Sequence, residues 1–385
     1  MRIRFLACAC LALFFAAFRA SAQPPPVKDS FEDLSHRAQM NLDSHPDEAA
    51  ALYKRALALR PKWPEGWLYM GGALYECRRF AEASDALRKG VALSPDIGSG
   101  WALLGLSESQ LEDPDQALAD IRKGEGLGLG SNTQFETAVR ARAAQLLIHA
   151  SAFDEALAQL QPLTKRPQEP LPVVETMGLC ALSWPDDLTA LTPEKRAVVD
   201  LAGQAAWAFA TERPDAAAAA YRELLAKYPK EPGVHYAYGL YVMETDQKAG
   251  LAEFQAEVQN NPKHWPALLV IGSIQIRQGE PDQAIKTLHA ALSAAPPKYH
   301  WLCHADLGRA NLDAGHIDAA IAELQNAAQQ MPGSAQPHFL LAQAYRQAGR
   351  AADADRERAI FEKIKAQLDP LGVPALKPFG DTGKN

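Results

Sequence analysis

The stretch "WALLGLSESQLEDPDQALADIRKG" occupies residues 101–124 and alternates bulky with very small side chains on a regular schedule. The residues that set this schedule are, in order, Trp101, Gly105, Ala117, Ile121 and Gly124. The small residues would let two helix backbones approach closely, while Trp101 and Ile121 fill the space beside them. The interval from Gly105 to Ala117 accommodates the rest of one helix, a turn and the start of a second. The stretch therefore predicts a hairpin of two antiparallel helices.

The same spacing recurs along the chain with a period of about 34 residues. Four further copies are Trp67, Gly71, Ala83, Leu87, Gly90 and Pro95; Gly272, Ala284, Leu288, Ala291 and Pro296; Gly308, Ala320, Leu324, Ala327 and Pro332; and Ala205, Ala217, Tyr221, Leu224 and Pro229. Each proline is expected to end a second helix, because the residue before a proline avoids helical geometry. Self-similarity at this period is typical of a stacked array.

A Pro-Asp pair shortly before the alanine of several copies supports the same interpretation. Proline suits the first helical position, and an aspartate in the first turn complements the helix dipole. The pairs are Pro46-Asp47, Pro114-Asp115, Pro214-Asp215 and Pro281-Asp282. They predict where the second helix of each hairpin begins.

The joint order of Trp, Gly, Ala, a large apolar residue, a small residue and Pro resembles the tetratricopeptide repeat family. The resemblance implies an all-α fold, an α-solenoid of antiparallel helical hairpins wound as a right-handed superhelix. A cluster of prolines between residues 162 and 193 interrupts the rhythm and predicts two arrays. The expected organisation is a flexible segment at 23–30, an array of about four repeats at 31–165, a Pro-rich linker at 166–195 with one helix near 173–183, an array of about five repeats at 196–365, and a flexible tail at 366–385.

The first 22 residues have the order of a secretory signal peptide. Arg2 and Arg4 precede an apolar run at 5–18, and small residues ending at Ala22 follow. The apolar run is shorter than the roughly 20 residues that a membrane-spanning helix needs. We expect cleavage after Ala22 and export to the periplasm or the exterior, with no membrane span in the mature chain. The alternative is an uncleaved anchor.

Charge and cysteine content restrict the partners and the chemistry. Loss of Arg2, Arg4 and Arg19 with the signal peptide would change the net charge from −7 to −10, which disfavours nucleic acid as a partner. The cysteines that remain are Cys77, Cys180 and Cys303. We expect three buried thiols rather than a disulfide framework, the alternative being one pair and one free thiol.

Two stretches could carry chemistry, and both have a simpler explanation. Residues 123–132, "KGEGLGLGSN", contain four glycines but lack the strand and the Lys-Ser/Thr of a nucleotide loop, so a turn is expected. Residues 300–304, "HWLCH", place His300, Cys303 and His304 within about one helical turn, a spacing that could bind zinc or copper. No fourth ligand is evident, and His304 occupies the position of Trp101 in its repeat. We therefore expect no catalytic residue, cofactor or metal.

The family resemblance implies a concave groove lined by the first helix of each repeat. Carried over residue by residue, the groove positions are Leu68, Tyr75, Ala102, Leu106, Tyr236, Met243, Leu269, Arg277, Ala305, Arg309, Leu312, Phe339, Gln343 and Arg346. Aromatic and arginine side chains are common interface anchors. The candidate partner-binding residues are accordingly Tyr75, Tyr236, Arg309, Phe339 and Arg346, the alternative being that several of them pack against neighbouring helices. The lysine-asparagine arrangement that clamps a C-terminal carboxylate in some members is absent.

These expectations favour an exported, non-catalytic scaffold that binds a protein or peptide in its groove. One alternative is a metal-dependent or enzymatic envelope protein with chemistry at residues 300–304 or at the linker. Another is a structural spacer between two envelope partners, for which the linker would matter more than the groove.

Overall fold

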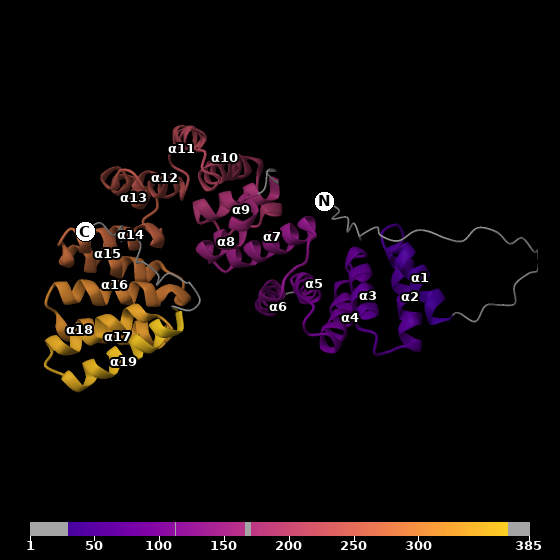
Figure 1. The fold of residues 1–385 in the computed structure, drawn as a ribbon. Helices are drawn as coiled ribbons and strands as arrows, with labels where there is room; N and C mark the ends of the chain where they lie inside the picture. Colours follow the sequence, from indigo (N-terminus) through magenta and orange to yellow (C-terminus); the bar gives the residue numbers. More distant parts are fainter. Residues whose placement is uncertain (1–29, 112, 166–170, 369–385) are drawn as a thin grey trace, which may run out of the picture. The chain divides into compact units, whose positions relative to one another are not determined.

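A computed structural model describes residues 30–111, 113–165 and 171–368. These residues form 19 α-helices and three short 3₁₀ helices, and they include no strand (Figure 1). The prediction of an all-α solenoid of helical hairpins is confirmed. Residues 1–22, where a signal peptide is predicted, and most of the two predicted flexible ends lie outside the described residues.

The chain divides into two compact units. The first contains the residues up to Thr176 together with Pro185–Asp187, and the second contains Met177–Trp184 and the residues from Leu188 onward. The division falls inside helix α9 (Leu171–Leu182), within the segment where a linker is predicted. In the second unit α9 packs closely on α10, because a Cβ atom on Gly178 would lie 2.1 Å from the Val199 carbonyl oxygen.

The first unit is built from four helical hairpins, each made of two consecutive helices in contact. They are α1 (Phe31–Asn41) with α2 (Pro46–Leu59), α3 (Pro64–Glu76) with α4 (Phe80–Leu93), α5 (Gly98–Glu108) with α6 (Pro114–Leu127), and α7 (Thr133–His149) with α8 (Phe153–Leu160). The 3₁₀ helix η1 (Gln161–Lys165) follows the last of them.

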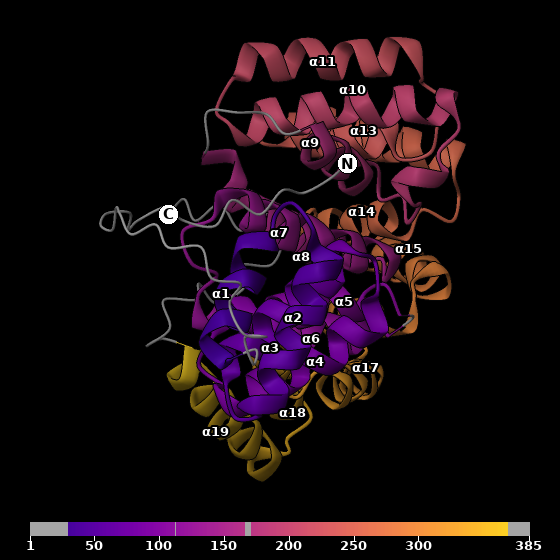
Figure 2. The same cartoon turned by 90° about the vertical axis from the view of Figure 1, so that its right-hand side faces the viewer.

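The second unit contains five hairpins, and Figure 2 shows the first of them with its two helices running side by side. They are α10 (Pro193–Ala210) with α11 (Pro214–Lys227), α12 (Val234–Met243) with α13 (Gln247–Asn260), α14 (Trp265–Arg277) with α15 (Pro281–Ala294), α16 (His300–Asp313) with α17 (Ile317–Gln330), and α18 (Ala335–Gln347) with α19 (Ala351–Leu368). The 3₁₀ helices η2 (Leu188–Ala190) and η3 (Pro297–Tyr299) precede α10 and α16. Helix α19 extends three residues past the expected boundary at residue 365.

The small residues act at the helix crossings as the sequence predicts. A Cβ atom on Gly105 would lie 2.5 Å from the Ala117 carbonyl oxygen, and one on Gly124 would lie 2.6 Å from the Gly98 carbonyl oxygen. Only residues without a side chain permit this approach of two backbones. Ala117 and Ile121 are fully buried beside the crossing.

Prolines and tryptophans join consecutive hairpins of the first unit. Helix α4 ends at Leu93, two residues before Pro95. The indole Nε1 of Trp101 then donates a hydrogen bond of 2.8 Å to the Pro95 carbonyl oxygen. Trp67 donates an equivalent bond of 2.8 Å to the carbonyl oxygen of Pro61. The residue that ends one hairpin thus anchors the first helix of the next.

Candidate functional site

The first helices of the last three hairpins form a continuous layer. Helix α16 contacts α14 on one side and α18 on the other. This layer carries three of the five predicted partner-binding residues, Arg309 on α16 and Phe339 and Arg346 on α18. Tyr75 lies in the other compact unit, on α3, and Tyr236 lies on α12.

Two arginines of this layer act electrostatically on one carboxyl group. The hydroxyl of Ser273 on α14 donates a hydrogen bond to Oδ2 of Asp306 on α16. Burial raises the pKa of Asp306 above its ordinary range, and the charges of Arg309 and Arg277 act in the opposite direction. Asp306 is therefore a partly buried acid on α16 that is subject to the charges of arginines on both α14 and α16.

Phe339 and Arg346 are the most accessible of the predicted residues. The Phe339 side chain is 45% exposed, although its ring packs against the ring of Phe361 at a centroid distance of 5.5 Å. Arg346 is also exposed. Exposed aromatic and arginine side chains are typical interface anchors.

Tyr75 and Tyr236 are held by neighbouring side chains. Tyr236 is only 9% exposed and belongs to the core, where its ring contacts Phe254 at 5.8 Å and His264 at 4.7 Å. Tyr75 is half-buried against Phe80, and burial raises the pKa of its hydroxyl. Packing therefore leaves Tyr236 little surface with which to meet a partner.

The residues of the alternative metal site have separate partners. His300 Nε2 lies 3.0 Å from the Ala295 carbonyl oxygen, and His304 Nδ1 lies 2.6 Å from Oε2 of Glu323. Cys303 is fully buried, and burial raises the pKa of its thiol to about 12. Across the described ranges, no group of three or more His, Cys, Asp or Glu side chains is arranged to hold a metal ion.

The glycine-rich stretch at 123–132 ends one helix and begins another. Helix α6 ends at Leu127, and Gly128 and Gly130 have positive φ angles of 98° and 80°. The Asn132 side chain then accepts hydrogen bonds from the backbone N–H groups of Gln134 and Phe135. The expected turn is confirmed.

The three cysteines form no disulfide with one another in the described part of the chain. Cys180 and Cys303 are buried, but Cys77 is half-buried, so the expectation of three buried thiols is wrong at this position. Burial raises the pKa of the Cys77 thiol to about 11, and the Asp47 carboxylate adds to the effect.

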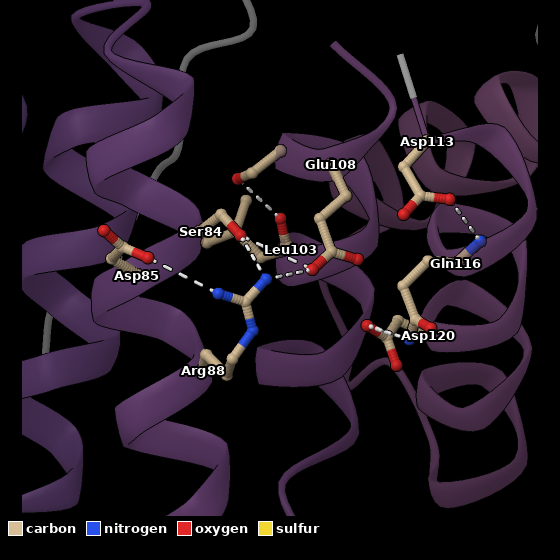
Figure 3. A network of polar contacts seen from close by, with 9 residues as sticks. Ser84, Asp85, Arg88, Leu103, Glu108, Asp113, Gln116 and Asp120 are labelled. Carbon is tan, nitrogen blue, oxygen red and sulfur yellow. Dashed lines mark hydrogen bonds and ion pairs between the residues drawn. The ribbon is translucent and has the colours of Figure 1, made fainter. Parts of the chain in front are cut away.

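A polar site that the sequence reasoning missed lies among α4, α5 and α6 (Figure 3). Arg88 on α4 contacts Oε1 of Glu108 at 2.8 Å and Oδ1 of Asp85 at 3.4 Å. On α6, Gln116 Nε2 donates to Oδ2 of Asp120 at 3.2 Å. The site brings two buried carboxyl groups together, since Glu108 is 4% exposed and Asp120 is 5% exposed.

The environment of Glu108 favours its neutral form. Burial first, and then the adjacent Asp120 carboxyl, raise the pKa of Glu108 from an ordinary 4.5 to about 7, against the opposing effect of Arg88. The repeat register could have revealed this site in the sequence. The residues 34 positions earlier are Leu74 and Ala86, so two acids replace two core side chains.

Sequence comparison places these features in a known family. Profiles described as tetratricopeptide repeat match residues 43–107 and 311–357, residues 203–249 and residues 267–298, and so cover parts of both compact units. The chain is a tetratricopeptide repeat protein. No curated protein matches its sequence.

Several solved structures match this chain at low sequence identity. A MamA double mutant from RS-1 is 16% identical, with a TM-score of 0.41 over 47% of this chain and 99% of its own. MamA from Desulfovibrio magneticus RS-1, beginning at its residue 41, gives the same values. A monomeric mutant of IFIT1 is 16% identical, with a TM-score of 0.33 over 87% of this chain and 72% of its own. At these identities the likeness concerns the fold alone.

Proposed function

We propose that this protein is an exported, non-catalytic scaffold that binds an extended segment of a protein partner along the layer formed by α14, α16 and α18. The observation that carries the proposal is the grouping of Arg309, Phe339 and Arg346 on adjacent first helices of one compact unit. First helices are also the groove-lining helices of the tetratricopeptide repeat family.

The charge of this layer is opposite to that of the chain. The protein has a net charge of −7, whereas the layer carries three arginines against two aspartates. These residues are Arg277, Arg309 and Arg346, with Asp306 and Asp313. A partner segment with acidic and apolar side chains would complement the arginines and Phe339 together.

Export is the second part of the proposal, and it is supported by the sequence of residues 1–22. In the described ranges, none of the helices combines the length and the apolar character required of a membrane-crossing segment. A partner in the periplasm or outside the cell is therefore proposed.

Affinity capture with matched variants tests the binding surface. The bait is the chain from residue 23 onward, compared with a variant carrying Arg309→Glu, Phe339→Ala and Arg346→Glu. The control variant carries Lys286→Glu, Arg358→Glu and Ile360→Ala, which alter similar exposed residues on the second helices α15 and α19. Circular dichroism verifies that all three proteins are folded.

Capture of one protein by the wild type and the control, with loss in the first variant, is the expected result. Equal capture by all three baits would exclude the layer as the binding surface. Export is tested separately by fractionating cells and sequencing the N-terminus of the recovered protein. A chain that begins at residue 23 is expected, and an intact chain confined to the cytoplasm would contradict export.

A further inference from the structure

A pocket of about 410 Å³ opens between the second helix of one hairpin, α4, and the next hairpin, α5 and α6. Its lining residues are Arg88, Trp101, Leu104, Glu108, Gln116 and Asp120. Trp101 and Leu104 supply apolar walls, and two carboxyl groups supply the polar wall. The pocket lies in the first compact unit, so it is separate from the α14, α16 and α18 layer of the second.

One carboxylate oxygen in this pocket has no donor. Arg88 and Ser84 both contact Oε1 of Glu108, at 2.8 and 3.4 Å, but Oε2 is buried and no hydrogen-bond donor in the described part of the chain reaches it. Figure 3 shows this second oxygen facing the side of α6 that carries Gln116 and Asp120. Two carboxyl groups that face each other away from water need a proton or a cation between them.

In other hairpins an imidazole contacts the acid at the same register position. In α16 and α17, His304 Nδ1 lies 2.6 Å from Oε2 of Glu323, which occupies the repeat position of Asp120. The pairs His338 with Glu357 and His235 with Glu253 repeat this contact, each at 2.6 Å. In all three hairpins an imidazole stands where Trp101 stands in α5.

Hairpin α5–α6 therefore has an acid, Asp120, at the position of these glutamates, but it has Trp101 in place of the histidine that contacts them. The chain's nearest cation, Arg88, is 59% exposed and is shared with Asp85. Lys123 places its ammonium group 3.3 Å from the centroid of the Trp101 ring and is not among the residues that line the pocket. Above about pH 7, where Glu108 loses its proton, the lining residues carry the two negative charges of Glu108 and Asp120 against the one positive charge of Arg88.

We propose that this pocket binds the cationic end of a lysine or arginine side chain presented by a protein partner. The apolar stem of such a side chain packs against Trp101 and Leu104, while its head donates hydrogen bonds to Oε2 of Glu108 and to Asp120. A metal ion fits less well, because the pocket offers two carboxylates and no cluster of three ligands. The site goes beyond the proposed groove and does not depend on it.

Indole NMR signals provide a local test with an internal control. The chain has seven tryptophans, and labelling them with ¹⁵N gives one indole signal each. Trp101 lies in the pocket, whereas Trp67 makes the same hydrogen bond in the preceding repeat, which has Leu74 and Ala86 at the positions of the two acids. The Trp101→Phe and Trp67→Phe variants assign the two signals.

The probes are the capped peptides acetyl-Gly-Lys-Gly-amide and acetyl-Gly-Arg-Gly-amide, with acetyl-Gly-Gln-Gly-amide as the neutral control. At pH 8 the cationic probes are expected to shift the Trp101 signal saturably and to leave the Trp67 signal in place. The double variant Glu108→Gln, Asp120→Asn should weaken binding about tenfold or more, because it removes the charge from both acceptors. Glu323→Gln, which alters the acid at the same register position in a hairpin where His304 already contacts it, should bind like the wild type.

Several results would overturn the proposal. An equal shift by the glutamine peptide, equal shifts of both indoles, or no shift with either cationic peptide would each exclude a cation pocket. Tighter binding of spermidine than of the peptides would reassign the site to a free polyamine. A shift produced by Ca²⁺, Mg²⁺ or Zn²⁺ alone, at concentrations where the peptides have no effect, would reassign it to a metal ion.

Discussion

The two compact units place different chemistry at the same position of the repeat. Four residues before the small residue of the helix crossing, the first unit has Trp67 and Trp101, and the second has His235, His304 and His338. Each tryptophan donates its indole N–H to the carbonyl oxygen of the proline that ends the preceding hairpin. Each histidine instead lies 2.6 Å from a glutamate of its own hairpin.

This difference distinguishes positions that determine the helix packing of every repeat from a position whose residue differs between repeats. The crossing glycines and the prolines recur in both units, and they set the approach of the helices and their ends. The position before the crossing tolerates an indole that links two hairpins or an imidazole that links two helices. Hairpin α5–α6 combines a tryptophan, Trp101, as in the first unit, with an acid, Asp120, at the position where the second unit has its glutamates. The pocket lies at this hairpin.

The largest expected effect compares the crossings of two hairpins. A Cβ atom on Gly105 would lie 2.5 Å from a backbone carbonyl oxygen, that of Ala117, whereas a Cβ atom on Gly308 would meet only the side chain of Leu324, which can adjust more than a backbone. Gly105→Ala is therefore expected to cost about 3 kcal/mol and Gly308→Ala about 1 kcal/mol. Hydrogen exchange of the two hairpins, read by mass spectrometry, measures both losses. Equal losses of stability would contradict the expectation that a clash with a backbone atom costs more than a clash with a side chain.

A buried histidine of the second unit predicts a loss of stability in acid. Burial lowers the pKa of His264 from an ordinary 6.5 to about 4, with Glu257 Oε1 3.9 Å from its Nε2. The unfolded chain therefore binds a proton that the folded chain does not, and stability falls as the pH drops from 6.5 towards 4. Between about pH 7.5 and pH 5 the loss should be ~2 kcal/mol.

The matched variant for this prediction is His264→Asn, which keeps a side-chain acceptor for the Ala267 N–H at the start of α14. Its unfolding free energy, followed by urea denaturation, should depend less steeply on pH than that of the wild type. Parallel pH profiles for the two proteins would mean that His264 is not the titrating group.

A buried carboxyl group of the first unit predicts the opposite dependence of stability on pH, namely a loss as the pH rises. The pKa of Glu108 is raised from 4.5 to about 7, so the folded chain retains a proton that the unfolded chain loses. Stability is fully present below pH 4.5 and declines as the pH rises through 7. Glu108→Gln should gain about 1–2 kcal/mol over the wild type at pH 8 and much less at pH 5, allowing for screening by water at the pocket mouth. A gain independent of pH would contradict the assignment.

The fold could be predicted from the sequence because its determinants are local and periodic. Gly105, Ala117 and Pro95 each act at a fixed offset from the others, so one hairpin predicts the rest. The helix expected near 173–183, outside the repeat register, is observed at Leu171–Leu182. Periodicity could not tell whether a groove position is open, because that depends on contacts across hairpins.

Tyr236 illustrates the limit of register reasoning. It occupies a groove position by offset, yet Phe254 and His264 enclose its ring. Glu108 and Asp120 illustrate the converse, since each acid is unremarkable in the sequence and only the packing of α5 on α6 makes them a buried pair. Phe339 and Arg346, by contrast, are exposed on the helix layer where their offsets place them.

The smallest expected effect concerns the lysines that lie over the rings of Trp101 and Trp67. Lys123 lies 3.3 Å from the centroid of the Trp101 ring, and Lys89, one repeat earlier, lies 4.6 Å from that of Trp67. Both lysines are exposed, so Lys123→Met should cost about 0.5–1 kcal/mol and Lys89→Met less, because the attraction to the ring weakens with distance. Methionine keeps most of the apolar stem, which isolates the loss of the charge. Urea denaturation of both variants measures the difference. If Lys89→Met costs as much as Lys123→Met, the two tryptophans are held by their hydrogen bonds to Pro61 and Pro95 and not by the cations above them.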